Sequence, residues 1–520
     1  YDHYTPQGRV KAQKEKEGLT RTYSYFPAYT LVSDSLGRTE RYDFEGEGGR
    51  KRWTGHVADD GATKRFEYDS AGRLLRSFDE LNRPTRYHRD AEGRIIGSTS
   101  PDGAMVSLAL DAVTGLPIES NTPTGQTRIE YDDRGNPLCV TRPDGAQSRQ
   151  AYENPALPDR PTRITDARGG IKHLAWTPLG QLESFTDCSG RTTTYRYDDS
   201  GQRIEEINAL GQSTHYEYDR AARLTRIRLP DGNALDYHYD ERGQQIALTD
   251  PLGQTTHAAY DEVGRLVRNT DPAGRAVAYR YDEAGRLARL INENGIATLF
   301  AWDVRDRLIG ETGFDGRLQR YRYNAAGELI EKEENGALIR LEYDKAGRVL
   351  TRQLPATDAA PASLHRFKYD PAGRLVEANS PEARIAFAYD SAGQRVSETQ
   401  THEDHWSYTL AHTYTPLGVL QSSAYPDAPP VQWLSYGSGH LHGVEIGGAA
   451  VLAFERDALH REIERQTDGL ICRTVRDALG RPAQQRMSAR QSPLDTPLWA
   501  RDNQYDPLGQ LRQVEDSVSG

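Results

Sequence analysis

Carboxylates recur at many points along the 520 residues of this sequence, where an aspartate follows an aromatic residue. Two carboxylates from distant repeats could serve as the acid and the base of a glycosidase. Nearly all of these aspartates, however, open short segments of turn-forming residues such as Asp282-Glu283-Ala284-Gly285. A turn role explains every copy at once, whereas catalysis needs one pair in one place. The pattern therefore favours structural aspartates, with a glycosidase as the weaker alternative.

Histidines are the second group that could do chemistry, and they gather towards the C-terminal end of the sequence. They are His402, His405, His412, His440 and His442. His440 and His442 would share one face of a strand, where two imidazoles can bind a metal ion. No cysteine or carboxylate is spaced to complete such a site, so surface or wall-lining histidines are the favoured interpretation. Because no nucleophile elbow, phosphate loop or dinucleotide motif stands out either, we expect no catalytic residue, metal or cofactor.

Composition excludes several classes of protein. The sequence is polar, with 36% hydrophobic residues and a mean hydropathy of -0.77, but its 29 regularly spaced tyrosines argue against disorder. A net charge of -11 gives no basic surface for nucleic acid. The three cysteines (Cys139, Cys188 and Cys472) suit neither a disulfide framework nor a zinc motif, and no apolar run approaches the roughly 20 residues of a membrane span. The charged run 11–21 is typical of a solvated linker.

An internal repeat of 21 residues dominates the sequence and must be interpreted before any other feature. Its aromatic ladder is Trp176, Tyr197, Tyr218, Tyr239, Tyr260, Tyr281, Trp302 and Tyr323. A glycine ladder with the same period is Gly190, Gly211, Gly232, Gly253, Gly274, Gly295 and Gly316. Similar phrases with looser spacing extend in both directions, from Tyr68-Asp69 to Tyr505-Asp506.

Each repeat has the chemistry of one β-hairpin. Tyr279-Arg280-Tyr281 alternates with period two, which is typical of a strand. The aspartate of the next segment can accept N–H groups across a turn, and Gly285 can supply a positive φ. Asp271-Pro272-Ala273-Gly274 has the same character at the opposite end of the hairpin. The positions that we expect to build the repeat are Tyr197, Asp198, Tyr218, Asp219, Tyr239, Asp240, Tyr260, Asp261, Tyr281 and Asp282, with Gly211, Gly253, Gly274 and Gly285.

A train of such hairpins cannot stay flat. About two dozen hairpins with strands roughly 4.8 Å apart would make a ribbon on the order of 200 Å long. Open sheets longer than about ten strands coil or split, and strand twist drives the coiling. We therefore predict an all-β chain, a long antiparallel sheet that spirals into a hollow shell. A β-propeller with two repeats in each four-stranded blade is the alternative, although consecutive repeats look equivalent.

The phrases "YDEAGRL", "YDSAGRLL", "YDPAGRL" and "YDKAGRV" closely resemble the YD repeat, also called the RHS repeat. Its full pattern, G-x-x-T-x-Y-x-Y-D-x-x-G-R-L, is matched from Gly211 to Asp219 and departs at Ala222, where glycine is expected. The resemblance covers essentially the whole chain. It points to Rhs-type bacterial polymorphic toxins, with teneurins and toxin-complex subunits as further relatives. It implies a hollow cocoon of spiralling sheet around a C-terminal toxin domain, often delivered by type VI secretion.

Family members also carry a C-terminal core-associated segment with a D-P-x-G-L signature, which cuts the toxin free. Asp506-Pro507-Leu508-Gly509-Gln510 is superficially similar, but the same letters occur in ordinary turns such as Asp250-Pro251-Leu252-Gly253. We therefore expect a fragment without this segment or a toxin. Residues 1–400 are predicted to be YD-repeat shell, most regular at 176–330. Residues 401–450 are predicted to be variant repeats with longer loops, and 451–520 further YD-like repeats.

The resemblance implies a non-catalytic shell segment that encapsulates and carries a C-terminal toxin for secretion and interbacterial competition. Its expected partners are that toxin domain, components of a secretion machine and a chaperone, without nucleic acid or a membrane span. The protein would be made in the bacterial cytoplasm and then secreted or delivered into a target cell. A surface adhesion or carbohydrate-binding array is the alternative, since tyrosine rings can stack on sugars. Cross-strand aromatic pairing is the favoured interpretation of the ladders.

Overall fold

The computed structural model describes residues 3–5, 8–14, 18–357, 361–403, 406–490 and 497–517, so His405 lies outside the described residues. Within these ranges, 48 β-strands form one sheet. The helical structure of the same ranges is one short 3-10 segment, η1 (Gly48–Arg50). The prediction of an all-β chain is confirmed.

The strands of the first half of the chain are β1 (His3–Tyr4), β2 (Val10–Lys14), β3 (Thr20–Tyr25), β4 (Tyr29–Asp34), β5 (Thr39–Glu45), β6 (Arg52–Val57), β7 (Thr63–Tyr68), β8 (Leu74–Phe78), β9 (Pro84–Arg89), β10 (Ile95–Thr99), β11 (Met105–Leu110), β12 (Pro117–Thr122), β13 (Gly125–Tyr131), β14 (Pro137–Thr141), β15 (Gln147–Ala151), β16 (Arg163–Thr165), β17 (Ile171–Trp176), β18 (Leu182–Thr186), β19 (Thr192–Tyr197), β20 (Arg203–Ile207), β21 (Ser213–Tyr218), β22 (Leu224–Arg228), β23 (Ala234–Tyr239) and β24 (Gln245–Thr249). Those of the second half are β25 (Thr255–Tyr260), β26 (Leu266–Thr270), β27 (Ala276–Tyr281), β28 (Leu287–Ile291), β29 (Ala297–Trp302), β30 (Leu308–Thr312), β31 (Leu318–Tyr323), β32 (Leu329–Glu334), β33 (Ala337–Tyr343), β34 (Val349–Leu354), β35 (Ser363–Tyr369), β36 (Leu375–Asn379), β37 (Ala383–Tyr389), β38 (Arg395–His402), β39 (Ser407–Tyr414), β40 (Leu420–Tyr425), β41 (Ala428–Tyr436), β42 (His440–Ile446), β43 (Ala449–Arg456), β44 (Glu462–Gln466), β45 (Leu470–Arg476), β46 (Pro482–Ala489), β47 (Trp499–Tyr505) and β48 (Leu511–Asp516).

Every strand pairs antiparallel with the strands that precede and follow it in sequence, as β28 does with β27 and β29. Among the described residues, strands contact only these sequence neighbours. A propeller would divide the strands into separate blades, whereas here one sheet continues from β1 to β48. The spiralling-sheet prediction is therefore confirmed, and the propeller alternative is wrong.

A β-bulge beside each tyrosine–aspartate turn helps to curl the ribbon. In the hairpin of β27 and β28, Arg280 pairs with Arg289 but Tyr281 pairs with Leu287, so Ala288 is the extra residue. The same register shift recurs at other hairpins of this kind, for example before Tyr260 and Tyr323. Because a bulge bends its strand and increases the local twist, bulges repeated at one edge of the ribbon favour a steady curl.

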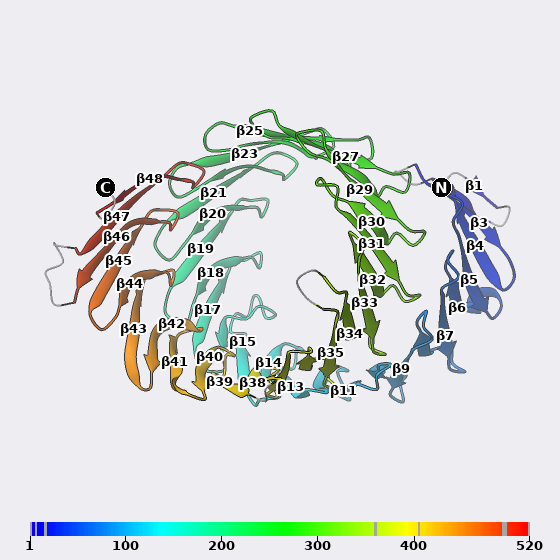
Figure 1. Cartoon of the computed structure of the whole chain (residues 1–520), viewed down its shortest axis with the longest axis horizontal. Helices are drawn as coiled ribbons and strands as arrows, with labels where there is room; N and C mark the ends of the chain where they lie inside the picture. The colour runs from blue at the N-terminus through cyan, green and yellow to red at the C-terminus, as the bar shows by residue number, and fades with distance from the viewer. Residues whose placement is uncertain are drawn as a thin grey trace.

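The ribbon curls until its second half lies alongside its first half, as Figure 1 shows around the central opening. Hydrogen bonds join residues that are 225 positions apart, as in Arg305 and Glu80, and 274 positions apart, as in Arg142 and Pro416. These separations are close to half of the 520 residues. The chain therefore forms an open, hollow shell of two adjacent turns.

The wall of this shell is one sheet thick and has almost no core. The buried hydrophobic residues of the described chain are Leu19, Ala58, Ala62, Cys139 and Ala247. A sheet normally buries one face against a second layer, and this sheet has none. This arrangement explains why so polar a sequence folds: its stability rests on contacts along the sheet rather than between layers.

Two segments differ from the regular frame in instructive ways. The interpretation of 11–21 as a linker is wrong, because β2 includes Val10–Lys14 and β3 begins at Thr20. Between 401 and 450 the period changes where strands lengthen: β39 has 8 residues and β41 has 9, against 5 or 6 in the regular repeats. The division of the chain at 400 and 450 stays a prediction.

Gly274 provides a test of the turn geometry. Its φ is 82°, and a Cβ added there would meet no atom within 4 Å, so a substitution meets backbone strain without a steric clash. We expect Gly274→Val to destabilise its hairpin by about 1–3 kcal/mol, because β-branched residues resist positive φ. Gly274→Asn should cost less, since asparagine tolerates this region. Amide hydrogen exchange of β26 and β27 measures the difference, and equal protection in the two variants would contradict it.

Candidate functional site: the seam between the two turns of the shell

The turn aspartate holds the hairpin tip together through both of its carboxylate oxygens. Asp282 Oδ1 accepts the N–H groups of Ala284 at 3.0 Å and Arg286 at 2.9 Å, and Oδ2 accepts Nε of Arg286 at 2.8 Å. The N–H of Gly285 donates to the carbonyl of Asp282 at 3.0 Å. The same pair of backbone N–H groups, two and four residues on, reaches Asp198, Asp219, Asp240 and Asp261.

The carboxylate of this turn is stabilised in its charged form. Burial raises the pKa of Asp282, but the hydrogen bonds from the side chain and backbone of Arg286, its charge and the N–H of Ala284 outweigh burial. The net pKa of Asp282 lies below its ordinary value. The turn therefore presents a fixed anion that orients the arginine four residues later.

The aromatic ladder supplies a hydrogen-bond donor as well as a ring. Tyr281 donates its hydroxyl to the carbonyl of Leu266, 15 residues earlier, at 2.8 Å. Tyr197, Tyr218, Tyr239 and Tyr260 make the same bond at 2.8 to 2.9 Å. At the ladder position Trp302, the indole Nε1 donates to Leu287 at 2.9 Å. Tyrosine and tryptophan share this position because each carries a donor on an aromatic ring.

The four glycine positions have the backbone conformation that the repeat predicts. Gly211, Gly253, Gly274 and Gly285 have φ values between 75° and 82°. This left-handed region is readily accessible to glycine and uncommon for other residues. The structure thus places the predicted tyrosines, aspartates and glycines at the two edges of the ribbon, and it does not gather them into one site.

Arginines at these edges carry the contacts from one turn of the shell to the other. We call this line of contacts the seam. Arg305 Nη2 lies 2.8 Å from Glu80, Arg83 lies 2.8 Å from Glu328, and Arg348 lies 2.9 Å from Asp102. The remaining cross-turn pairs include Arg38 with Asp306, Arg307 with Asp60, Arg142 with the carbonyl of Pro416 and Arg168 with Ser435. The seam is therefore polar and runs between hairpin tips.

Exposure separates arginines in the seam from equivalent ones outside it. The side chains of Arg38 and Arg83 are 15% and 16% exposed, whereas those of Arg275 and Arg317 are 70% and 51% exposed. All four arginines lie at the same kind of hairpin turn. Arg38 and Arg83 belong to the first half of the chain, and Arg275 and Arg317 belong to the second half. This difference in exposure shows that contact between the two turns of the spiral shields one edge of each half of the ribbon from water.

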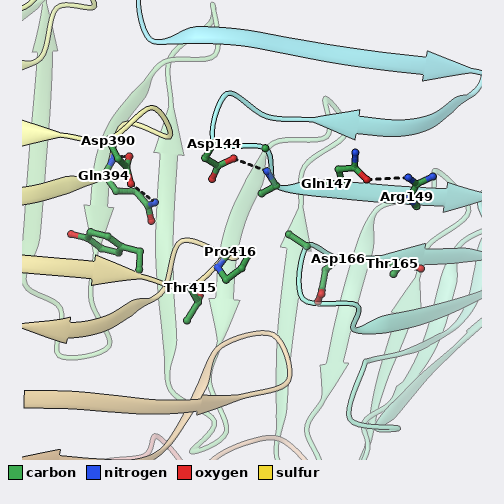
Figure 2. A pocket seen from close by; sticks show the side chains of 13 residues that line it. Asp144, Gln147, Arg149, Thr165, Asp166, Asp390, Gln394, Thr415 and Pro416 are labelled. Atoms are coloured by element: carbon green, nitrogen blue, oxygen red, sulfur yellow. Dashed lines mark hydrogen bonds between the residues drawn. The ribbon is translucent and has the colours of Figure 1, made fainter.

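One of the cavities along the seam has a volume of about 670 Å³, and Figure 2 shows it between hairpin tips of the two halves. In this region the position four residues after the turn aspartate is Gly170 after Asp166 and Gln394 after Asp390, in place of arginine. Within the described residues, Asp166 Oδ2 and Gln394 Oε1 are buried without a hydrogen-bond partner. Both substituted positions belong to the hairpin tips that line the cavity.

One histidine of the group predicted to be surface or wall-lining residues, His440, lies in a cluster that the sequence did not predict. His440 stacks on His460 with ring centroids 3.6 Å apart, and His460 Nε2 lies 2.6 Å from Asp187 on the other turn. Sequence spacing missed this carboxylate because it is 273 positions away. No group of three or more metal-binding side chains is present in the described ranges. His402, also from the predicted group, contacts Trp406 instead.

Two further predictions from the sequence can be compared with the structure. Asp506 forms an ordinary turn, since its Oδ1 accepts the N–H groups of Leu508 at 3.0 Å and Gln510 at 2.9 Å. This geometry matches the turn at Asp250. A search of the described segments for helices finds none with the length and apolarity needed to cross a bilayer.

A disulfide can test whether the two turns touch. Cys188 Sγ and Ser438 Oγ lie 3.2 Å apart across the seam. We expect Ser438→Cys to form a disulfide with Cys188 under mild oxidation, detected by peptide mapping without reductant. Ser200→Cys is the control, because it sits at the opposite edge of the ribbon, about 20 Å away along a six-residue strand. An unlinked Cys188 in the Ser438→Cys protein would contradict the seam.

An alanine substitution can test how much the seam stabilises the fold. Arg305→Ala leaves Glu80, whose side chain is 8% exposed, without its closest cation. We expect a loss of about 2 kcal/mol in the free energy of urea unfolding, because a nearly buried carboxylate loses the nearer of its two cations and keeps only Lys64 at 3.5 Å. Arg275→Ala removes an exposed ion pair with Asp271 within one hairpin turn. It should lower the free energy of unfolding by less than about 0.5 kcal/mol. Equal urea midpoints for the Arg305→Ala and Arg275→Ala proteins would show that the ion pairs of the seam do not stabilise the fold.

Comparison with known proteins extends these observations. The model of the teneurin YD-shell matches residues 129–299, and the model of the RHS repeat matches residues 68–105 and 281–318. A structure of the Photorhabdus luminescens Tc holotoxin pore is 16% identical, covers 99% of this chain and 29% of that chain, and has a TM-score of 0.35.

Two curated relatives are toxins. Toxin protein Tse5 of Pseudomonas aeruginosa is 48% identical over 526 aligned residues, which cover 99% of this chain and 40% of that protein. Double-stranded DNA deaminase toxin A of Burkholderia cenocepacia is 32% identical over 386 residues, which cover 71% of this chain and 27% of that protein. The chain thus spans less than half the length of either relative. With its repeats, its matches to the RHS-repeat and teneurin YD-shell family models and its 48% identity to Toxin protein Tse5, the chain belongs to the RHS/YD-repeat family.

Proposed function

We propose that this chain is the wall of a shell that encloses a C-terminal toxin domain and carries it to a target cell. The observation that supports this proposal most strongly is the 48% identity to Toxin protein Tse5, of which the chain spans 40%. The toxin activity of such a protein can then lie in the part of its length that this chain does not cover. The curled wall supplies a container, and its repeated side chains are engaged in holding that wall together.

The contacts of the repeat positions support a wall without catalysis of its own. The turn carboxylates are occupied by backbone N–H groups and arginines, as at Asp219. The tyrosine hydroxyls are occupied by backbone carbonyls, as at Tyr239. A general base needs a free proton-accepting group beside a substrate, and a general acid needs a proton that it can donate there. We therefore propose structural roles for these positions, and toxin activity in another part of the protein.

The same contacts make a carbohydrate-binding array the weaker candidate. A sugar-binding tyrosine presents a free ring face and a free hydroxyl. Here arginines lie over several ladder rings, for example Arg265 over Tyr281 at 4.7 Å and Arg223 over Tyr239 at 5.0 Å. With the hydroxyls also bonded, the ladder has little left with which to hold a sugar.

Protease protection of the complete gene product tests the proposal. We expect a C-terminal toxin segment to resist a protease that degrades the same segment when it is produced alone. Unfolding the shell in urea should abolish this protection. A C-terminal segment digested at the rate of the isolated domain, or a product with specific glycan binding and no further domain, would overturn the carrier function.

The expected route and partners follow from the same proposal. We propose that the protein is made in the bacterial cytoplasm and is then secreted or delivered, with secretion components and a chaperone as partners. Type VI secretion is the route that the resemblance implies. Loss of toxin delivery to neighbouring cells in a strain without that secretion system, with unchanged production of the protein, is the expected result.

A further inference from the structure

His460 occupies a turn position that is usually glycine. It stands three residues after Asp457 and donates its N–H to the carbonyl of that aspartate at 3.0 Å, as the turn glycines do. Its φ is 60°, a conformation that is uncommon for a residue with a side chain. Such strain persists only where the surroundings favour it, and it often marks a functional contact.

The side chain of His460 is held from three directions. Nε2 lies 2.6 Å from Asp187 Oδ2 on the other turn of the shell, and Nδ1 lies 2.9 Å from the hydroxyl of Tyr436. The ring of His440 stacks on it at 3.6 Å with an angle of 6° between the planes. The side chains of His460 and Asp187 are 12% and 18% exposed. These contacts join β18–β19, β41–β42 and β43–β44 into one cluster across the seam.

We propose that this cluster of Asp187, His440 and His460 is a pH-sensitive latch, which holds the two turns together near neutral pH and loosens on acidification. The latch belongs to the wall itself, whatever the wall encloses. Most other seam contacts pair an arginine with a carboxylate or a carbonyl. Arginines and ordinary carboxylates keep their charge between pH 8 and pH 5. A latch built on imidazoles differs from them in this respect.

The charges around the stacked rings decide the direction of the response. Asp187 and Asp457 are the nearby anions, Arg191 and Arg456 are the nearby cations, and His442 and Tyr436 complete the surroundings. Arg461 is neutralised by Asp457 at 2.7 Å. Asp187, the other anion, is already bonded to His460. A proton added to His440 would place a positive charge close to the Arg456 guanidinium and against the stacked ring of His460.

Burial lowers the pKa of His440, and the neighbouring His460 and Arg456 lower it further, against a smaller opposing effect of Asp187. A histidine whose pKa is lower in the folded state stabilises the fold above its ordinary value, about 6.5. That contribution is lost as the pH falls through the lower folded value, because the unfolded chain then binds more protons. The latch should therefore weaken below about pH 6.5.

Hydrogen exchange on the whole chain tests the latch. Exchange is measured at pH 7.5 and pH 5.0, with correction for the intrinsic rates, in segments 185–192 and 454–462. We expect protection there to fall at least tenfold at pH 5.0. The reference is the seam contact of Arg348 with Asp102, 2.9 Å apart, where protection should not change. A parallel loss at both places, or no loss at either, would overturn the proposal.

Two variants separate the latch from a general effect of acid. His440→Phe keeps a stacked ring but cannot be protonated, so protection should become independent of pH. His460→Gly restores the glycine of the turn and removes the bond to Asp187, so protection should be low at both pH values. Thermal melting checks that each variant is folded. A His440→Phe protein that still loses protection in acid would show that the stacked histidines are not the sensor.

Discussion

A sheet one layer thick has no opposing layer against which to bury its side chains, and the rest of this structure depends on that constraint. Contact between layers is the usual source of stability in β proteins. Here it is replaced by contacts along the ribbon, which most repeats make in the same way. The aspartate closes the turn, the arginine joins it to its neighbours and the aromatic donor binds an earlier strand. Repetition lets a polar sequence accumulate enough of these contacts to remain folded.

Curvature and closure follow from the same repeated unit. The bulge at each tyrosine–aspartate turn, as at Tyr281, favours a curl that brings the second half of the ribbon beside the first. Since strands pair only with their sequence neighbours, hairpin tips must join the two halves. The arginine that closes a turn within one half can also reach a carboxylate in the other, as Arg348 does with Asp344 and Asp102. One residue type thus serves both the repeat and the shell.

The sequence predicts the repeat and the curl because both are local. The period, the turn chemistry and the length of the ribbon are sufficient for a spiralling antiparallel sheet. The seam could not be predicted, since many repeats offer the same arginine and aspartate. Which of them meet, such as Arg305 and Glu80 at a separation of 225 positions, depends on the radius of the spiral. The partner of His460 was hidden for the same reason, although a histidine in place of the turn glycine was a visible signal.

Residues that depart from the repeat can therefore indicate which hairpin tips meet across the seam. Asp306 and His460 both replace a turn glycine, both have positive φ, and both bind a residue on the other turn. Ala222 also replaces the glycine, with a φ of 64°, but its methyl group can form no polar contact. The strain of a side chain at this position is thus offset in some repeats by a bond across the seam.

An electron cryo-microscopy map of the purified chain would test the architecture most directly. The structure predicts a curved wall one sheet thick in which the tip near Asp187 touches the tip near His460. An extended ribbon without contact between its halves, or separate blades around an axis, would contradict both the seam and the container that rests on it.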